Sequence, residues 1–576
     1  MFSNLKTFLG KDNFNIIFLI LLISTLSAFV EILVINSLAL FVTLLVDAKL
    51  FLKSLPIEAL KVYLSNLSKK DLVYNVSYFI LFIVFFKSIF ISLINYFEIS
   101  FFSKVKLRNS KLLFSYYITR NYNYYLNKYL PEILTNSFHE MERAHTYLVQ
   151  VFACIREILL AILIFYFLFT KSFIITSICL LIFSLLGFIY FFSIKNFLAR
   201  KSEETSFFHN KLFNIFTNAL EDIKFIKVIN CEKNYINNHS LFQNKVINAE
   251  KFSTFFTRLP RNILELFGIL VFILSIFYFL RIDNDTSIII TELSLFGFAI
   301  LRLIPIFSII VSNLTNIKYF HQSFLKITDE ISGYRNDISK TEYKNNKILD
   351  TNENIRNIRN ISLKNIDYKY ENSSVPTLEN INVNFQYKKI TGIKGPSGSG
   401  KSTLIGVLLG LLTPINGKID FEFEDDYTSK IIPKNIFGYV PQNIFLMDDT
   451  IRRNIALGVE DEKIDDKKII ECLKHANIFE QFNNSKYKLD TNLGYRGLKL
   501  SGGQIQRIGI ARALYFDPKF IVLDESTSAL DKETEQLILK EISNLKKIMG
   551  FIVISHREST MSICDKVYTI DKGKII

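Results

Sequence analysis

The chain has 576 residues, of which 49% are hydrophobic, and it carries a formal net charge of +14. This length exceeds one ordinary folding core, and this apolar content is too high for a soluble globular protein, so membrane spans are expected. The positive charge could indicate nucleic-acid binding. However, the basic residues are scattered and no groove-reading motif appears. Lys and Arg retained in cytoplasmic loops explain the positive charge better, so no nucleic-acid partner is expected.

The five cysteines indicate neither a disulfide framework nor a zinc site, because they are odd in number, widely separated and without CxxC spacing. The first residues, MFSNLKTFLGKDNF, do not resemble a cleaved signal peptide. The apolar stretch behind them is too long and lacks a small-residue cleavage site. We therefore expect that stretch to be a membrane span.

Residues 1–330 contain six apolar stretches that are each long enough to cross a membrane. Two polar connections, 98–149 and 194–261, are rich in Lys and Arg, which places them in the cytoplasm together with both termini if the spans alternate. The segment 47–71 would then lie outside, either as a short helix on the membrane surface or as a loop helix packed on the bundle. The expected spans are 16–46, 72–97, 150–169, 172–193, 262–281 and 287–312.

The second half of the chain has a different character. Residues 331–360 are polar and rich in Asn and Lys, which predicts a linker. Residues 361–576 alternate short strands, glycine turns and helices, which predicts an α/β domain. We therefore expect an all-α six-helix membrane domain followed by an α/β domain with a phosphate loop. No internal repeat or second such domain appears, so the chain would form one half of a symmetric assembly.

A glycine-rich loop opens the motifs of the α/β domain. Residues 395–403 read GPSGSGKST, which matches GxxxxGK[ST], between a strand-like run and a helical run. Backbone N–H groups of such a loop surround phosphates, Lys401 reaches the β- and γ-phosphates, and Ser402 ligates Mg²⁺. The loop residues expected to bind ATP are Gly395, Pro396, Ser397, Gly398, Ser399, Gly400, Lys401, Ser402 and Thr403.

An apolar strand ending in two acids, FIVLDE at 520–525, follows the loop in the same domain. Asp524 is expected to approach Mg²⁺. Glu525 is placed to polarise the attacking water as a general base. On its own, an apolar strand ending in two acids would be weak evidence of a nucleotide site. The phosphate loop earlier in the same domain strengthens that evidence.

The run LSGGQ at 500–504 resembles the signature of the ABC transporter superfamily. The resemblance implies that Tyr370 stacks on adenine and that Gln442, in VPQNIFL, approaches the metal. It also implies that Asp531, in SALD, forms the D-loop and that His556, in ISHRES, is the switch histidine. The catalytic residues would be Glu525, His556 and Lys401.

In this superfamily, ATP is held between the phosphate loop of one copy and the signature of another. The signature would then contact the nucleotide of the partner, so the chain should act as a homodimer. The sequence departs from the family pattern in two places: Tyr495 stands where an acid is frequent, and Arg557-Glu558 stands where an apolar residue is usual. The signature residues expected at the nucleotide are Ser501, Gly502, Gly503 and Gln504.

Charged side chains inside spans are costly and therefore indicate function. Lys87 and Arg302 lie in the second and sixth spans, both roughly 24 Å from the outer face at about 1.5 Å per residue. Arg258 and Arg261 flank Pro260 at the cytoplasmic end of the fifth span. A dimer would double this set into a basic lining suited to an anionic cargo, especially a phosphate or pyrophosphate. Alternatively, these cations pair internally with Glu31, Glu98, Glu265 or Glu292.

The spans resemble those of bacterial lipid-linked oligosaccharide flippases, notably in LPRNILELFG around Arg261 and ILRLIPIFSII around Arg302. The resemblance implies ATP-driven flipping of a polyprenyl-pyrophosphate-linked oligosaccharide, for N-glycosylation or O-antigen assembly, across the bacterial cytoplasmic membrane. One alternative is a multidrug or lipid exporter of the same architecture. Another is an ATP-gated channel or regulatory scaffold that does not pump.

Overall fold

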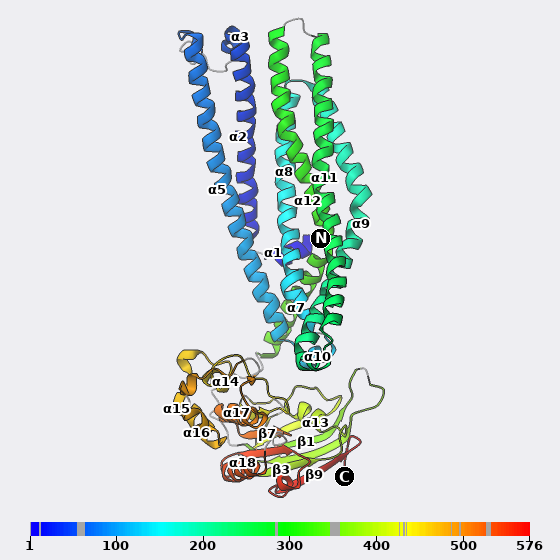
Figure 1. Ribbon diagram of the computed structural model, residues 1–576, viewed down its shortest axis with the longest axis vertical. Coiled ribbons are helices and arrows are strands. Elements are labelled where there is room, and N and C mark those ends of the chain that lie inside the picture. Colours follow the sequence, from blue (N-terminus) through cyan, green and yellow to red (C-terminus); the bar gives the residue numbers. More distant parts are fainter. Residues whose placement is uncertain are drawn as a thin grey trace. The chain divides into compact units, whose positions relative to one another are not determined.

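The computed structural model describes residues 2–576 except 11–12, 55–60, 62–63, 129, 283–285, 346–357, 372, 425–426, 430–431, 434, 485, 495–496 and 526–530. The described residues fall into two compact units. A helical unit lies within residues 2–345, and an α/β unit lies within residues 358–576 (Figure 1). The expected class, six long apolar helices followed by an α/β domain, is confirmed.

Six helices of the helical unit are long and apolar enough to cross a membrane. Each expected span lies in one of them, with Ser172 as the N-cap of the fourth. They are α2 (Phe14–Val46), α5 (Lys69–Ile118), α8 (Met141–Phe169), α9 (Phe173–Glu221), α11 (Glu232–Ile282) and α12 (Thr286–Asn345). Shorter elements are α1 (Phe2–Leu9), α3 (Ala48–Ser54), α6 (Tyr122–Asn127), α7 (Leu130–Thr135), the π-helical turn η2 (Asn136–Glu140) and α10 (Ile223–Ile229).

Several helices continue well beyond the apolar spans. Helices α5 and α9 extend into the polar connections, and α11 begins within the second connection. These connections hold no Gly or Pro between residues 98 and 130 or between 194 and 259, so helices can continue through much of their length. Residues 331–345 of the expected linker likewise continue α12, and 358–360 already belong to a strand.

Small residues bring the helices of the bundle together. Ala28 and Ala299 are fully buried in a core that joins α2, α8, α9, α11 and α12. A Cβ on Gly268 of α11 would lie 2.6 Å from Ile304 of α12. Close approach of this kind is how helices pack in a bilayer, where hydrophobicity does not drive helix association. In the segment 47–71, Phe51 of α3 and Leu64 are buried in one cluster with Leu44, so these residues pack on the bundle, and residues 55–60 and 62–63 lie outside the described residues.

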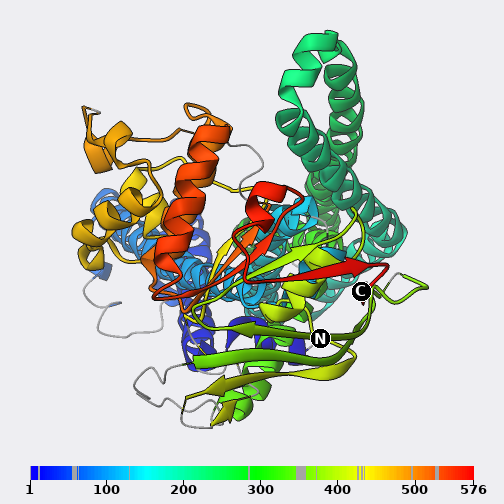
Figure 2. The ribbon, with the colours of Figure 1, turned by 90° about the horizontal axis from the view of Figure 1, so that it is seen from below.

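The α/β unit contains two sheets. The smaller is antiparallel, with the order β2-β1-β4-β5, and the larger has the order β10-β9-β3-β8-β7-β6 with parallel pairs from β9 to β6. Figure 2 shows the green and yellow-green strands of the smaller sheet side by side. The strands are β1 (Ile358–Tyr368), β2 (Leu378–Gln386), β3 (Ile390–Lys394), β4 (Asn416–Phe423), β5 (Thr428–Ser429), β6 (Phe437–Val440), β7 (Phe520–Asp524), β8 (Gly550–Ile554), β9 (Lys566–Asp571) and β10 (Lys574–Ile575).

Strand β7 separates the two cores of the α/β unit. Phe520 and Val522 pack into a core with β1, β2 and α13, whereas Ile521 and Leu523 pack into a second core with α15, α17 and α18. This alternation is the period-two geometry of a strand buried on both faces. The helices are α13 (Lys401–Leu408), α14 (Ile451–Ile455), α15 (Asp466–His475), α16 (Phe479–Asn483), α17 (Gly502–Tyr515), α18 (Lys532–Leu545) and α19 (Glu558–Met561), with 3-10 turns η3 (Asp461–Lys463) and η4 (Lys488–Asp490).

The parallel strands of the larger sheet gather the expected nucleotide residues at one edge. The carboxyl ends of neighbouring parallel strands meet at the same edge, which is where open α/β sheets bind ligands. The phosphate loop follows β3, Glu525 follows β7, His556 follows β8 and Gln442 follows β6.

Candidate functional site

The phosphate loop is shaped by its glycines. Gly398 and Gly400 have φ values of +78° and +106°, a conformation that favours glycine. A Cβ on Gly395 would lie 2.0 Å from the carbonyl oxygen of Ile570, so no larger residue fits there without a backbone shift. The Lys401 ammonium, 7% exposed, donates to the carbonyls of Gly395 at 2.9 Å and Pro396 at 2.8 Å. Two carbonyl groups of the loop thus hold the Lys401 side chain against the loop.

The donors of this loop fit a polyphosphate. Helix α13 begins at Lys401, so the free N–H groups of its first turn and its dipole face the loop. The buried Ser399 hydroxyl has no hydrogen-bond partner in the described part of the chain. Ser402 is exposed at the helix start, and the Thr403 hydroxyl lies 3.2 Å from the hydroxyl of Tyr370. Tyr370 therefore lies beside the loop.

Two adjacent carboxylates stand at the end of β7. Asp524 is 8% exposed and accepts a hydrogen bond from the Tyr439 hydroxyl at 3.4 Å. Burial, and then the charge of Glu525, raise the pKa of Asp524, so a bound cation would relieve both effects. No three or more His, Cys, Asp or Glu side chains of the described residues gather to hold a metal by themselves. A Mg²⁺ ion would therefore rely on few protein ligands and on phosphate oxygens, as this metal usually does.

Glu525 is held from two sides by residues of neighbouring strands. Gln442 Nε2 donates to Glu525 Oε2 at 2.7 Å, and His556 Nε2 lies 3.4 Å from Glu525 Oε1. Glu525 itself has a φ of +47°, which costs a non-glycine residue roughly 1–3 kcal/mol. The structure therefore brings together three residues that are spread over more than 100 positions of the sequence, and it holds the carboxylate in a strained conformation typical of functional sites.

The LSGGQ run begins helix α17. The Ser501 hydroxyl accepts from Gln504 N at 3.3 Å and the Gln504 side chain accepts from Ser501 N at 2.7 Å, which forms a capping box. Ser501 and Gly502 are exposed. Leu500 and Ile505 pack on the core that holds α15, α17 and α18, whereas the phosphate loop stands on the other core. Within one chain, the signature and the phosphate loop therefore pack on different hydrophobic cores.

The remaining motif residues are only partly described. Asp531 is the N-cap of α18 and accepts from Thr534 N at 3.0 Å, which lowers its pKa. Residues 528–530 of the SALD run, and Tyr495, lie outside the described residues. Glu558, the other departure from the family pattern, is exposed at the first position of α19.

Sequence reasoning missed Glu535, which anchors the segment after His556. Its buried carboxylate pairs with Arg557 and accepts from the hydroxyls of Ser559 at 2.9 Å and Thr560 at 3.3 Å. Glu535 stands on the buried face of α18, with Ile538, Leu539 and Ile542. An acid in an apolar helical stripe was the signal that could have identified it.

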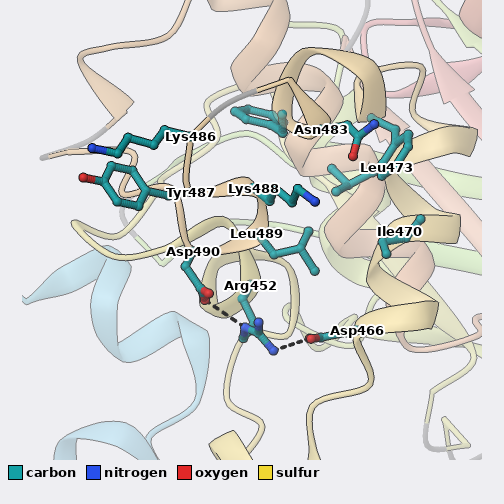
Figure 3. A pocket seen from close by; sticks show the side chains of 12 residues that line it. Arg452, Asp466, Ile470, Leu473, Asn483, Lys486, Tyr487, Lys488, Leu489 and Asp490 are labelled. Carbon is teal, nitrogen blue, oxygen red and sulfur yellow. Dashed lines mark hydrogen bonds and ion pairs between the residues drawn. The ribbon is translucent and has the colours of Figure 1, made fainter.

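A separate hollow of about 370 Å³ lies among α14, α15, α16 and η4 (Figure 3). Arg452 spans it, pairing with Asp466 and donating to Asp490 at 3.2 Å. None of the expected nucleotide residues lines it. This hollow is therefore not the candidate nucleotide site.

In the helical unit, Lys87 and Arg302 meet on one carboxylate. Lys87 Nζ lies 2.7 Å from Glu31 Oε2, and Arg302 donates to Glu31 Oε1 at 2.6 Å. The alternative of internal pairing therefore holds for both cations, with Glu31 as the partner. Glu98, another of the suggested partners, pairs with Arg156 instead.

Arg258 and Arg261 line a cavity of about 650 Å³ between α11 and α12. The hydroxyls of Ser308 and Ser312 and the amide of Asn313 also line it. The buried Asn313 Nδ2 lacks a hydrogen-bond partner within the described ranges. Two guanidinium groups and a spare amide donor make this cavity suited to an anionic group.

Comparisons with known proteins agree with this geometry. Residues 378–528 match the family model described as ABC transporter. The chain is 41% identical over 218 residues to heavy metal tolerance factor 1 of Caenorhabditis elegans, covering 38% of this chain and 27% of that protein. It is 32% identical over 269 residues to an ATP-dependent lipid A-core flippase of Francisella tularensis, covering 46% and 42%. The chain thus matches less than half the length of each relative.

The whole chain also resembles a solved structure. A bacterial Atm1-family ABC exporter with ATP bound superposes with a TM-score of 0.75 at 19% identity, over 96% of this chain and 94% of that one. This likeness is one of fold. The α/β unit is thus an ABC transporter ATPase domain. Among the described residues, the helical unit has six helices that are long and apolar enough to cross a membrane.

Proposed function

We propose that this chain is one half of an ATP-driven ABC exporter that works as a homodimer. The observation that carries the proposal is the complete set of motif residues on a single α/β unit, with the phosphate loop and the signature on different cores. A nucleotide bound at Lys401 would need Ser501 from a second copy. Because each copy supplies both, a homodimer would contain two equal sites.

Within each site the residues take distinct roles. Lys401 and the loop N–H groups would hold the phosphates, and Tyr370 would contact adenine. A bound Mg²⁺ ion would neutralise phosphate charge, held by Ser402 and Asp524 with Gln442 nearby. Glu525 would orient and deprotonate the attacking water, and His556, on the other side of that carboxylate, would fix its position. Asp531, Gly502, Gly503 and Gln504 would complete the contact between copies.

The proposed cargo is a polyprenyl-pyrophosphate-linked oligosaccharide, moved across the bacterial cytoplasmic membrane with the α/β unit on the cytoplasmic side. The cavity with Arg258 and Arg261 supports an anionic head group. The group of Glu31, Lys87 and Arg302 keeps one unneutralised positive charge, which supports the same cargo class. The Francisella relative, named as a lipid A-core flippase, is consistent with an anionic lipid.

Neutralising the basic residues tests this cargo. We expect flipping of a polyprenyl-pyrophosphate-linked glycan in proteoliposomes to fall at least about tenfold in an Arg258→Gln/Arg261→Gln variant, because charged contacts to phosphate are lost. The same is expected of Glu31→Gln/Lys87→Gln/Arg302→Gln, which removes both cations without leaving a buried carboxylate unpaired. The matched control is Glu98→Gln/Arg156→Gln. Unchanged flipping in both of the first two variants would contradict the proposed cargo.

A multidrug or lipid exporter of the same architecture is the second candidate. The pairing of Lys87 and Arg302 with Glu31 favours it, because internal pairing reduces the basic character of the lining. Stimulation of the ATPase by neutral or cationic amphiphiles, without stimulation by the pyrophosphate lipid, would support this candidate.

A further inference from the structure

One buried carboxylate ties three membrane helices together. One carboxylate oxygen of Glu31 in α2 pairs with Lys87 of α5, and the other pairs with Arg302 of α12. The side chain of Glu31 is 3% exposed, whereas those of Lys87 and Arg302 are 18% and 38% exposed. The cations therefore face more open space than the anion that holds them.

The charges of this group do not balance. One negative and two positive charges leave a single positive charge, and without Glu31 two cations would stand unneutralised inside the spans, which is costly in a bilayer. Arg302 also has N–H groups that are not bonded to Glu31. A guanidinium carries five N–H donors, and the Arg302 Nε has no hydrogen-bond partner in the part of the chain that the structure describes.

We infer that Glu31 competes with the anionic cargo for Arg302 and so sets the affinity of the membrane site. This inference rests on the proposed function and identifies a residue within the same site. A phosphate oxygen of the cargo takes the place of Glu31 Oε1 on Arg302, while Glu31 stays paired with Lys87. Arg302 exchanges because its side chain is the more exposed of the two cations. When the cargo leaves, Glu31 pairs with Arg302 again.

Direct binding to the full-length protein in lipid nanodiscs tests the inference. The probes are a fluorescent polyprenyl-pyrophosphate lipid and the matched uncharged polyprenol lipid. We expect Glu31→Gln to bind the pyrophosphate lipid about tenfold tighter than the unmodified chain, since coupling between close charge pairs is of this size or larger. Binding of the uncharged lipid should not change. The matched control is Glu98→Gln, which removes a buried, Arg156-paired carboxylate outside the group and should alter neither affinity.

A second variant separates competition from net charge and from misfolding. Glu31→Gln/Lys87→Gln keeps the single positive charge of the group and leaves one cation fewer inside the spans. We expect this variant also to bind the pyrophosphate lipid tighter, because Arg302 is released from Glu31. Unchanged or weaker binding in the correctly folded variants overturns the inference. If the unmodified chain binds both lipids equally, the proposed function fails, and the inference fails with it.

Discussion

Replacing Glu525 with Gln is expected to lower ATP turnover by a factor of at least about 100 while ATP binding persists. The carboxylate stands at the end of β7, between Gln442 and His556, and is the group that we propose takes a proton from the attacking water. An amide keeps the size of the side chain and can still accept a hydrogen bond, but it does not accept the proton. Phosphate release from the purified protein and binding of labelled ATP measure the two effects separately.

The control for this variant is Glu558→Gln. Glu558 is exposed and lies two residues from His556, outside the residues assigned to the site. It should hydrolyse ATP at the normal rate. Normal turnover in Glu525→Gln would remove the general-base assignment, and loss of ATP binding would show instead that Glu525 holds the nucleotide.

Mixed dimers are expected to show that each nucleotide uses residues of two chains. Lys401→Ala disables the phosphate loop and Ser501→Arg disables the signature. A dimer of one Lys401→Ala chain and one Ser501→Arg chain should keep one intact site, because the two defects fall on the same nucleotide. A dimer of an unmodified chain and a doubly substituted chain should have a defect at both sites and lose turnover by a factor of about 100 or more, as expected when groups that bind the transferred phosphate are removed.

The two mixed dimers would give the opposite results if each chain hydrolysed ATP without residues of its partner. In that case the first dimer would be inactive, and the second would keep the activity of its unmodified chain. Differently tagged chains, co-expressed and purified through both tags, provide the two dimers. Activity in the second dimer and none in the first would contradict the shared site.

The local structure of the candidate nucleotide site was the most predictable part of the molecule, because its motifs depend on local geometry. The run FIVLDE has to be a buried strand ending in acids, and GPSGSGKST has to be a tight loop before a helix. In contrast, the left-handed backbone of Glu525 follows from the surrounding strands rather than from its own sequence. The partners of Glu535 could not be predicted for the same reason, since its three donors come from a segment more than 20 residues away.

In the helical unit, hydropathy located the long apolar helices but not their ends. Polar residues such as those of 98–118 carry no apolar signal, yet they have no helix breaker either, so α5 continues through them. The sequence suggested that Lys87 and Arg302 pair internally, but it did not select their partner. Four acids were equally suited to them, and only the packing of α2 between α5 and α12 selects Glu31.

The most direct test of the account is transport by the purified protein in proteoliposomes. A fluorescent polyprenyl-pyrophosphate-linked oligosaccharide is placed in both leaflets, and its accessibility to an external enzyme is followed after ATP is added. We predict ATP-dependent movement that is absent with Glu525→Gln and absent for the matched uncharged lipid. No movement with ATP, or equal movement with Glu525→Gln, would contradict an ATP-driven flippase.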